Sequence, residues 1–539
     1  MNTAIYTIYN ILKLEVLFGG TIMNNKNEDK TINHTKIRQV KTFSIPFDLY
    51  EIKENLIINT NSFPENTEEK IINQAINFHL KGEIQEAIKY YQYCLDKGFY
   101  DAKILCNYGV IMKDLGRIKE AEFLQLKAIE IKPDYTEAYS NLGVIYKDIG
   151  KLKEAEKSIC KAIEINPDFA NAYNNLGIIL NDLGKLKEAE SAYLKAIEIK
   201  PDFSQSYYSL SLLKCSYKNK FWQNRLFSKN ILNNKSEKDK IDIYFARANV
   251  LHKHKNYKES AKYLNLANKI KLNLRPSNIN KRMQKSKRLL IDSGRKETCR
   301  KVDIKSIQTI FIVGMPRCGS TLIESILSMN YKVDSLGEIN VLEESFIEEE
   351  NHGQGLTLAE LYWQKINTIS SKLTIKTNKW LYNYQYVGII SCLIPNSKII
   401  HCFRNPLDNI LSIYRAHFRT GNEYSSSIED CANIYLDQEE IMTEYKKRYR
   451  SKIYDLNYDW LVGNPNQEIK SLISWLGWDW NHSYLSPHLN TRSVSTASSV
   501  QVRSPINAKS VGNWKNYKQM LKPAIDLITR IDKYNHLNS

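Results

Sequence analysis

A repeat of 34 residues is the feature of this 539-residue sequence that most restricts its fold. Four sets of small residues or prolines recur at this spacing. The sets are Gly82, Gly116, Gly150 and Gly184; Ala87, Ala121, Ala155 and Ala189; Gly109, Gly143 and Gly177; and Pro133, Pro167 and Pro201. Small residues let paired helices approach closely, and each proline ends a unit because it cannot continue a helix. The period therefore predicts stacked helix pairs over about 68–101, 102–135, 136–169 and 170–203.

This pattern resembles the tetratricopeptide (TPR) repeat, which forms a curved α-solenoid. We expect the array to span 68–274, with a degenerate stretch at 204–240 because the pattern fades after Leu213. Ala248, Ser260 and Ala267 restore the register and indicate a capping repeat. The resemblance implies that a protein or peptide partner binds the concave face. Polar and aromatic residues of the first helices either line that face or fill between helices: Tyr139, Asn141, Tyr173, Asn174, Asn175, Tyr207 and Tyr208.

The remaining boundaries follow from composition. Residues 1–67 are polar and read as a flexible leader, while 275–304 are rich in Lys and Arg and read as a basic linker. An apolar run over 4–23 contains Lys13 and Glu15, so we expect neither a signal peptide nor a membrane span, and translation could start at Met1 or Met23. From 305 to 539, short apolar strands alternate with helices, which favours an α/β sheet.

Charge and cysteine content limit the classes of function. The formal charge of +17 favours an anionic ligand, although the lysines are spread along the chain and no aromatic residues interleave with the basic linker. We therefore expect no nucleic-acid partner. Nine cysteines occur without a C-x-x-C pair or a zinc-like cluster, which favours a reducing cytoplasm and predicts no metal site.

The strongest chemical signal is a strand, a turn and a helix over Ile310–Ser328. Four apolar residues lead into Gly314, Gly319 closes the turn, and apolar residues then recur at helical spacing. Backbone N–H groups of such a turn, together with the helix dipole, form a cradle for an anion. Ser320 stands where the nucleotide-hydrolase loop has its lysine, which disfavours a kinase or hydrolase. Arg317 lies inside the turn and suits phosphate or sulfate oxygens.

The segment Pro316-Arg317-Cys318-Gly319-Ser320-Thr321-Leu322 resembles the P-R-[SC]-G-[ST]-T-L loop of sulfotransferases, especially the tyrosylprotein branch. This resemblance implies a P-loop-like, three-layer α/β domain that uses 3′-phosphoadenosine 5′-phosphosulfate (PAPS) and binds its 5′-phosphosulfate with these seven residues.

A second strand, turn and helix contains Arg404 and, eight residues later, Ser412. Arg404 follows the strand at the edge where open α/β sheets bind ligands. The pair resembles the family's motif for the 3′-phosphate of PAPS. Two anion sites suit a nucleotide that is phosphorylated at both ends.

The family resemblance also implies catalytic residues. Glu338 in a Gly-Glu pair corresponds to the general base, Lys379 to the catalytic lysine, and Arg317 and Ser498 to groups that contact the transferring sulfuryl or the phosphate. Lys515, in Gly512-Asn-Trp-Lys-Asn, is a candidate phosphate contact of a closing loop whose usual Arg-Lys-Gly is absent here. His401 is a rival base, but its place inside an apolar strand favours a hydrogen-bonded core role.

The sequence thus predicts a TPR α-solenoid followed by a sulfotransferase domain that acts on a hydroxyl, with a protein tyrosine favoured by the tyrosylprotein resemblance and the repeats. Three alternatives stay open. The acceptor could be a glycan or small molecule, the repeats could instead form a homodimer, and the chain could be a scaffold whose nucleotide-binding domain is inactive.

Overall fold

The structure, a computed structural model, describes residues 68–213, 220–295, 308–352, 356–369, 374–418, 421–490 and 502–538. The leader predicted over 1–67 therefore lies outside the described residues. No helix within the described ranges is long and apolar enough to cross a membrane.

Pairs of helices occupy the predicted repeats. They are α2 (Glu68–Lys81) with α3 (Ile84–Asp96), α4 (Ala102–Asp114) with α5 (Ile118–Ile131), α6 (Thr136–Asp148) with α7 (Leu152–Ile165), and α8 (Ala170–Asp182) with α9 (Leu186–Ile199). A Cβ atom at Gly177 would lie 2.5 Å from the ring of Tyr193, so only glycine permits the approach of α8 to α9. The repeated glycine therefore has the packing role that the period predicts.

The last part of the repeat region departs from the regular pattern of helix pairs. Helix α10 (Ser204–Leu212) is followed by the short helices α11 (Lys220–Leu226) and η3 (Lys229–Leu232), and then by a long pair, α12 (Glu237–Lys253) and α13 (Tyr257–Leu274). Tyr207 and Leu210 of α10 share a hydrophobic cluster with Ile243 and Ala246 of α12. Helix α12 thus packs directly against α10.

Part of the stretch read as a basic linker is helical. Helix α14 (Ile279–Arg295) buries Leu289 in a hydrophobic cluster of the C-terminal region. Ser286 Oγ donates to Asp437 Oδ2 at 2.9 Å and accepts from Gln385 Nε2 at 2.7 Å. Residues 279–295 therefore pack as part of the C-terminal fold, while the domain boundaries themselves stay a prediction.

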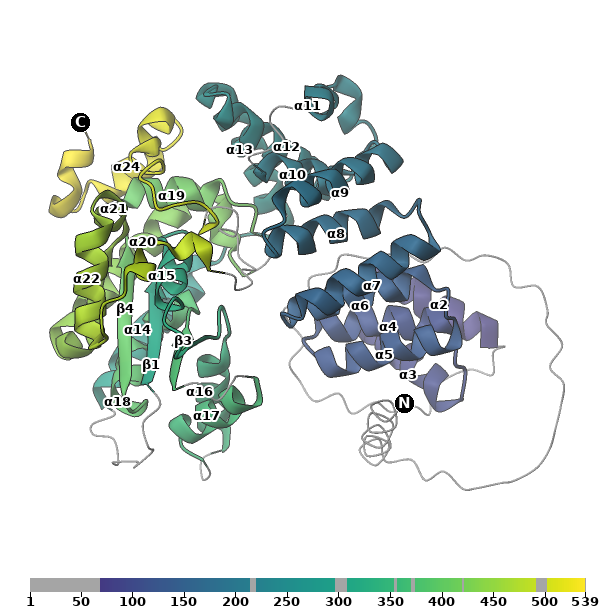
Figure 1. The fold of residues 1–539 in the computed structure, drawn as a ribbon, viewed down its shortest axis with the longest axis horizontal. Coiled ribbons are helices and arrows are strands. Elements are labelled where there is room, and N and C mark those ends of the chain that lie inside the picture. The colour runs from purple at the N-terminus through teal and green to yellow at the C-terminus, as the bar shows by residue number, and fades with distance from the viewer. Residues whose placement is uncertain are drawn as a thin grey trace. The chain divides into compact units, whose positions relative to one another are not determined.

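The C-terminal region is built on a parallel sheet of five strands in the order β2-β3-β1-β4-β5. The strands are β1 (Gln308–Gly314), β2 (Val333–Ser335), β3 (Ile375–Asn378), β4 (Ser397–Phe403) and β5 (Ile453–Asn457). Figure 1 shows β4, β1 and β3 side by side. This sheet confirms the predicted α/β architecture.

Two helical layers cover the faces of the sheet. Phe311 and Val313 of β1 point into a cluster formed with α14, α17, α18 and α20, whereas Ile310 and Ile312 point into a cluster formed with α15, α21 and α22. The strand is apolar on both sides because both faces are buried. The bounds are α15 (Ser320–Leu327), α16 (Val341–His352), α17 (Leu358–Ile369), α18 (Val387–Leu393), α19 (Pro406–Tyr414), α20 (Ile428–Tyr449), α21 (Tyr458–Gly463), α22 (Pro465–Leu476) and α24 (Lys522–Ile528).

Short 3₁₀ turns complete the chain: η4 (Leu381–Tyr386), η5 (Glu423–Ser426), η6 (Arg450–Lys452), η7 (His482–Leu485), η8 (Pro487–Leu489), η9 (Asn513–Tyr517) and η10 (Asp532–Leu537).

A half-buried histidine connects α12 to the C-terminal region. His252 Nδ1 lies 2.8 Å from Tyr517 Oη, and Arg415 Nη1 lies 3.0 Å from His252 Nε2. Burial, followed by the charge of Arg415, lowers the pKa of His252 from its ordinary 6.5 to about 3. The imidazole is therefore neutral in the folded chain at neutral pH.

The lowered pKa of His252 predicts that the folded protein loses stability in acid. Because the folded pKa is lower than the unfolded one, the contribution of His252 is fully present above about pH 6.5 and is lost as the pH falls toward 3. We expect the melting temperature of His252→Gln to depend less on pH than that of the wild type. The exposed His254, substituted by Gln, is the matched control and should keep the wild-type dependence. Equal dependences in all three proteins would contradict the assignment.

Candidate functional site

The predicted site residues follow the carboxyl ends of the strands. The turn after β1 holds Arg317, the segment after β2 holds Glu338, and Lys379 and Arg404 directly follow β3 and β4. The carboxyl ends of parallel strands meet at one edge of a sheet, which is where open α/β sheets bind ligands. Tyr458 follows β5 at the same edge.

The turn after β1 is held in a conformation that few residues adopt. Gly314 and Gly319 have φ values of 146° and 105°, and Arg317 has a φ of 67°, although it is not glycine. A Cβ atom at Gly314 would lie 2.2 Å from the carbonyl oxygen of Cys402, and one at Gly319 would lie 2.2 Å from Cδ2 of Tyr458. Strain of this kind persists at sites where a side chain must take one direction. It places Arg317 at the start of α15.

Arg317 contacts the residue that the sequence assigned to the other phosphate site. Its Nε donates to Ser412 Oγ at 3.2 Å. Burial, and next the positive charge of Arg404, lower the pKa of Arg317 to about 10. The two arginines are therefore close enough to repel one another, and the residues predicted for the two phosphate groups lie next to each other.

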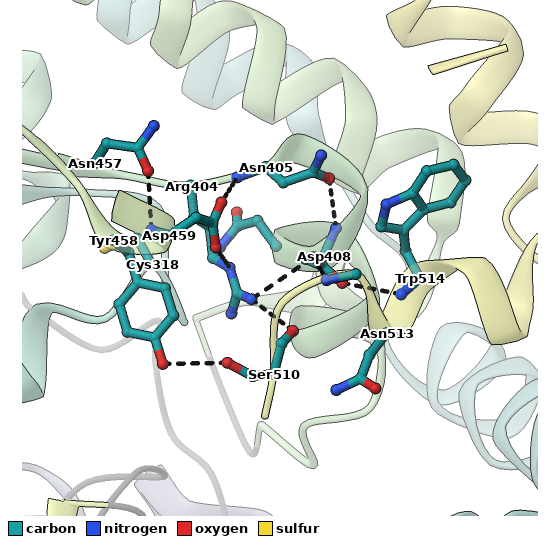
Figure 2. A network of polar contacts seen from close by, with 12 residues as sticks. Cys318, Arg404, Asn405, Asp408, Asn457, Tyr458, Asp459, Ser510, Asn513 and Trp514 are labelled. Atoms are coloured by element: carbon teal, nitrogen blue, oxygen red, sulfur yellow. Dashed lines mark hydrogen bonds and ion pairs between the residues drawn. The ribbon is translucent and has the colours of Figure 1, made fainter. Parts of the chain in front are cut away.

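Arg404 lies in a polar network at the start of α19 (Figure 2). Its Nη2 donates to the carbonyl oxygen of Ser510 at 3.0 Å, and its guanidinium carbon lies 4.8 Å from the centre of the Tyr458 ring. Two carboxylates flank it, since Nε is 3.8 Å from Asp459 Oδ1 and Nη2 is 3.9 Å from Asp408 Oδ2. The guanidinium is 5% exposed, so its orientation is determined by these neighbours.

Asp408 fastens the segment after residue 510 onto α19. Its carboxylate accepts from the backbone N–H groups of Gly512 at 2.6 Å and Trp514 at 2.9 Å (Figure 2). Burial raises the pKa of Asp408, against the effect of these N–H groups and of Arg404. The part of the predicted closing loop over 512–514 is thus attached to the helix that follows Arg404.

The hydrogen-bond donors at this edge of the sheet fit an anionic ligand. Arg404 Nε is buried and has no hydrogen-bond partner within the described part of the chain. Arg317 is a second, partly buried guanidinium, just before the N-terminus of an eight-residue helix. Two cations and oriented N–H groups at one strand edge match the phosphate and phosphosulfate groups of PAPS.

Lys379 and Glu338 form a direct ion pair. Lys379 Nζ lies 2.6 Å from Glu338 Oε1, and the lysine side chain is fully buried while that of Glu338 is 45% exposed. The backbone N–H of Lys379 donates to the carbonyl oxygen of Gly337 at 2.9 Å, which holds the two segments together. The predicted base and the predicted catalytic lysine therefore share one location.

The other predicted site residues differ from one another in burial and in contacts. Ser320 and Thr321 are buried in the first turn of α15, Leu322 packs against the core on that face, and the carbonyl oxygen of Pro316 accepts from Asn409 Nδ2 at 3.0 Å. Cys318 is buried, and its carbonyl oxygen accepts from Cys402 Sγ at 3.2 Å. Lys515 is exposed and makes none of the contacts around Arg404. Ser498 lies outside the described residues.

His401 is located in the core of the sheet. Its Nδ1 lies 3.3 Å from Asp455 Oδ1 and its Nε2 lies 2.6 Å from Gln438 Nε2. Burial lowers its pKa. With both ring nitrogens engaged, it occupies the hydrogen-bonded core position that the sequence favours over a role as base.

Sequence reasoning missed the acids and the aromatic ring around Arg404. Asp408, Tyr458 and Asp459 all follow strand ends, at the edge where Arg404 was expected. That position was a signal that could have identified them. Ser510 and Glu324 gave no comparable signal, because their contacts come from segments distant in the chain.

Comparison with known proteins agrees with both halves of the chain. Residues 340–482 match the sulfotransferase family, and residues 102–135, 136–169 and 170–203 match the tetratricopeptide repeat. The chain combines TPR repeats with a sulfotransferase domain. Both predictions of family are therefore confirmed.

Two relatives match parts of the chain. An uncharacterized protein of Aquifex aeolicus (strain VF5) is 28% identical over 246 residues, which cover 41% of this chain and 32% of that protein. A "Putative protein-tyrosine sulfotransferase" of Caenorhabditis briggsae is 23% identical over 240 residues, which cover 38% of this chain and 80% of that protein. The chain thus spans about a third of the length of the Aquifex relative.

Solved structures also match each half. The sulfotransferase domain of an olefin synthase from Synechococcus PCC 7002 is 17% identical, with a TM-score of 0.34, and covers 43% of this chain and 98% of its own. The protein MamA is 22% identical, with a TM-score of 0.25, and covers 37% of this chain and 96% of its own.

The turn conformation predicts that Gly319→Ala disables the sulfotransferase site. A Cβ would collide with Tyr458 and would force a residue with φ of 105° into strain, so we expect the affinity for adenosine 3′,5′-bisphosphate to fall by about tenfold or more. Isothermal titration calorimetry measures this affinity. Gly463→Ala is the matched control, because a Cβ there meets no atom within 4 Å. Equal affinities of the two variants would contradict the prediction.

Proposed function

We propose that the sulfotransferase domain transfers the sulfuryl group of PAPS to an acceptor hydroxyl and releases adenosine 3′,5′-bisphosphate. The observation that carries this proposal is that Arg317, Arg404 and the Lys379–Glu338 pair all follow carboxyl ends of strands in one parallel sheet. Arginines suit the two ends of a doubly phosphorylated adenosine, and the carboxylate–lysine pair suits proton transfer beside developing negative charge.

We assign one residue to each step of the transfer. The acceptor oxygen attacks sulfur, and the bond between sulfur and the bridging oxygen of the 5′-phosphate breaks. The proton of the acceptor hydroxyl passes to Glu338, whose half-exposed side chain is open to an incoming acceptor. The electron pair of the broken bond stays on the 5′-phosphate, where the ammonium group of Lys379 offsets the charge.

The donor is held by the turn after β1 and by Arg404. Arg317 and the backbone over residues 318–322 bind the phosphosulfate end. Arg404 binds the 3′-phosphate, while Ser412 supports Arg317, which it contacts in the structure. Ser320 at the position of the kinase lysine supports PAPS over ATP as the ligand.

We propose a tyrosine of a protein as the acceptor. Two observations support this choice: the repeat array, since such arrays commonly bind peptides, and the similarity to the putative protein-tyrosine sulfotransferase of Caenorhabditis briggsae. On the first helices, Asn141 Nδ2 donates to Cys106 Sγ at 3.1 Å and Asn175 Nδ2 donates to Ser140 Oγ at 3.2 Å. Both amides are half-buried, so they fill between helices and still reach solvent. The free thiols of the described cysteines support a reducing, cytoplasmic setting.

Titration of the purified chain with PAPS and with ATP, each with and without magnesium, tests the donor. We expect binding of PAPS without magnesium and at least tenfold weaker binding of ATP, because Ser320 replaces the loop lysine that contacts the β- and γ-phosphates. Incubation with ³⁵S-labelled PAPS and a cell extract then identifies the acceptor class. Label on protein tyrosine supports the proposal, label on glycans or small molecules overturns the acceptor, and tight ATP binding alone overturns the reaction.

The roles of Glu338 and Arg404 predict opposite kinetic effects. Glu338→Gln removes the base and should lower kcat by about 10²–10⁴-fold with donor affinity unchanged. Arg404→Lys keeps the positive charge but lacks the planar guanidinium, which can bond two phosphate oxygens at once. We expect this variant to bind PAPS about tenfold more weakly, with a smaller effect on kcat. Calorimetry with adenosine 3′,5′-bisphosphate and initial rates separate the two effects.

The exposed Glu344, substituted by Gln, is the control for loss of an acid near this segment and should behave as the wild type. If Glu338→Gln weakened donor binding and left kcat intact, the assignment of the base would be wrong.

A further inference from the structure

A second carboxylate lies beside Lys379, on the side away from solvent. Glu324, in the second turn of α15, places Oε2 3.9 Å from Lys379 Nζ, while Glu338 approaches the same nitrogen to 2.6 Å. The side chain of Glu324 is 2% exposed, compared with 45% for Glu338. The lysine is therefore contacted by one buried and one accessible acid.

The burial of Glu324 needs a polar partner. An ionised carboxylate that is removed from water costs several kcal/mol unless a cation or hydrogen-bond donors compensate for it. Here Thr377 Oγ1 lies 3.5 Å from Glu324 Oε1, and Lys379 supplies a positive charge within 4 Å. Thr377 lies at the end of β3 and Lys379 directly follows it, so Glu324 connects this end of the strand to the helix that begins after the Arg317 turn.

The two acids behave differently during the proposed transfer. Glu338 becomes neutral when it accepts the proton of the acceptor, and its attraction for Lys379 falls at the moment when negative charge develops on the donor. Glu324 is only 2% exposed, so the acceptor does not reach it and it does not take up the acceptor's proton. It therefore holds the ammonium group in place after Glu338 has been neutralised.

We propose that Glu324 is a positioning residue for Lys379, which keeps the lysine charged and directed toward the leaving phosphate throughout the transfer. This inference rests on the proposed sulfuryl transfer for its kinetic consequence. Its structural part, the hold of Glu324 on the ammonium group, is independent of the reaction. Because α15 follows the turn that contains Arg317, Glu324 also gives the lysine a fixed position relative to that turn.

Glu324→Gln tests the proposal, because it keeps the shape of the side chain and removes the charge. We expect kcat for ³⁵S transfer from PAPS to a tyrosine-containing peptide to fall by about tenfold to a hundredfold, with KM for PAPS and the affinity for adenosine 3′,5′-bisphosphate within about twofold of the wild type. Glu324→Asp, which restores the charge on a shorter side chain, should recover part of kcat.

A second measurement does not depend on activity. Competitive labelling with acetic anhydride, followed by mass spectrometry, reports the reactivity of the Lys379 amine in the full chain without donor. We expect Glu324→Gln to raise this reactivity by about tenfold, since loss of a carboxylate within 4 Å favours the neutral amine.

Ser325→Ala is the matched control. Ser325 is equally buried on the next position of α15, and its hydroxyl donates to the carbonyl oxygen of Thr321 at 2.9 Å. This variant perturbs the helix but leaves the carboxylates at Lys379, so it should change neither kcat nor the labelling of Lys379. Equal effects of Glu324→Gln and Ser325→Ala would show that Glu324 only packs the helix, and would overturn the proposal.

Failure of the proposed function gives a different result. A wild-type chain that binds adenosine 3′,5′-bisphosphate without transferring label would refute the transferase reaction. The labelling of Lys379 would still decide whether Glu324 holds its ammonium group. Unchanged labelling in Glu324→Gln overturns the positioning role even if the wild type is an active transferase.

Discussion

Burial of positive charge at one edge of a parallel sheet is the constraint on which the site depends. Lys379 and Arg404 are removed from water and Arg317 is partly buried, so each needs polar neighbours to remain charged there. Lys379 has two carboxylates, and Arg404 has Asp408 and Asp459. Arg317 bonds the hydroxyl of Ser412. Carboxylates therefore flank the first two cations, and a hydroxyl lies beside the third.

The turn after β1, which contains Arg317, packs tightly against β4 and against the residue that follows β5. The carbonyl oxygen of Cys402 in β4 and the ring of Tyr458 after β5 leave no room for a Cβ at Gly314 or Gly319. Tyr458 also packs against the guanidinium of Arg404. One aromatic ring thus limits the shape of the turn and the position of the second arginine, which couples the two halves of the anion site.

The last helices of the repeat region belong to the same hydrophobic core as the C-terminal helices. Phe245 of α12 and Leu264 of α13 share a cluster with Leu407 and Ile410 of α19, and Asn268 Nδ2 donates to the carbonyl oxygen of Tyr414 at 2.9 Å. Tyr517, next to the segment tied to Asp408, bonds Ser260 of α13 at 2.9 Å. Helix α19, which carries Asp408 and Ser412, therefore depends on α12 and α13 for its packing.

Periodicity and local motifs determined much of this protein by themselves. The repeated glycines, alanines and prolines specify helix pairs, because each acts within one or two neighbouring helices. The apolar runs before Gly314 and Arg404 likewise specify strands, since burial on both faces leaves a local signature. Tertiary structure alone decided which charged groups meet. Ser412 contacts Arg317 and Glu324 reaches Lys379 because parallel strands bring segments 95 and 55 residues apart to one edge, and the pairing depends on side-chain packing that no local spacing encodes.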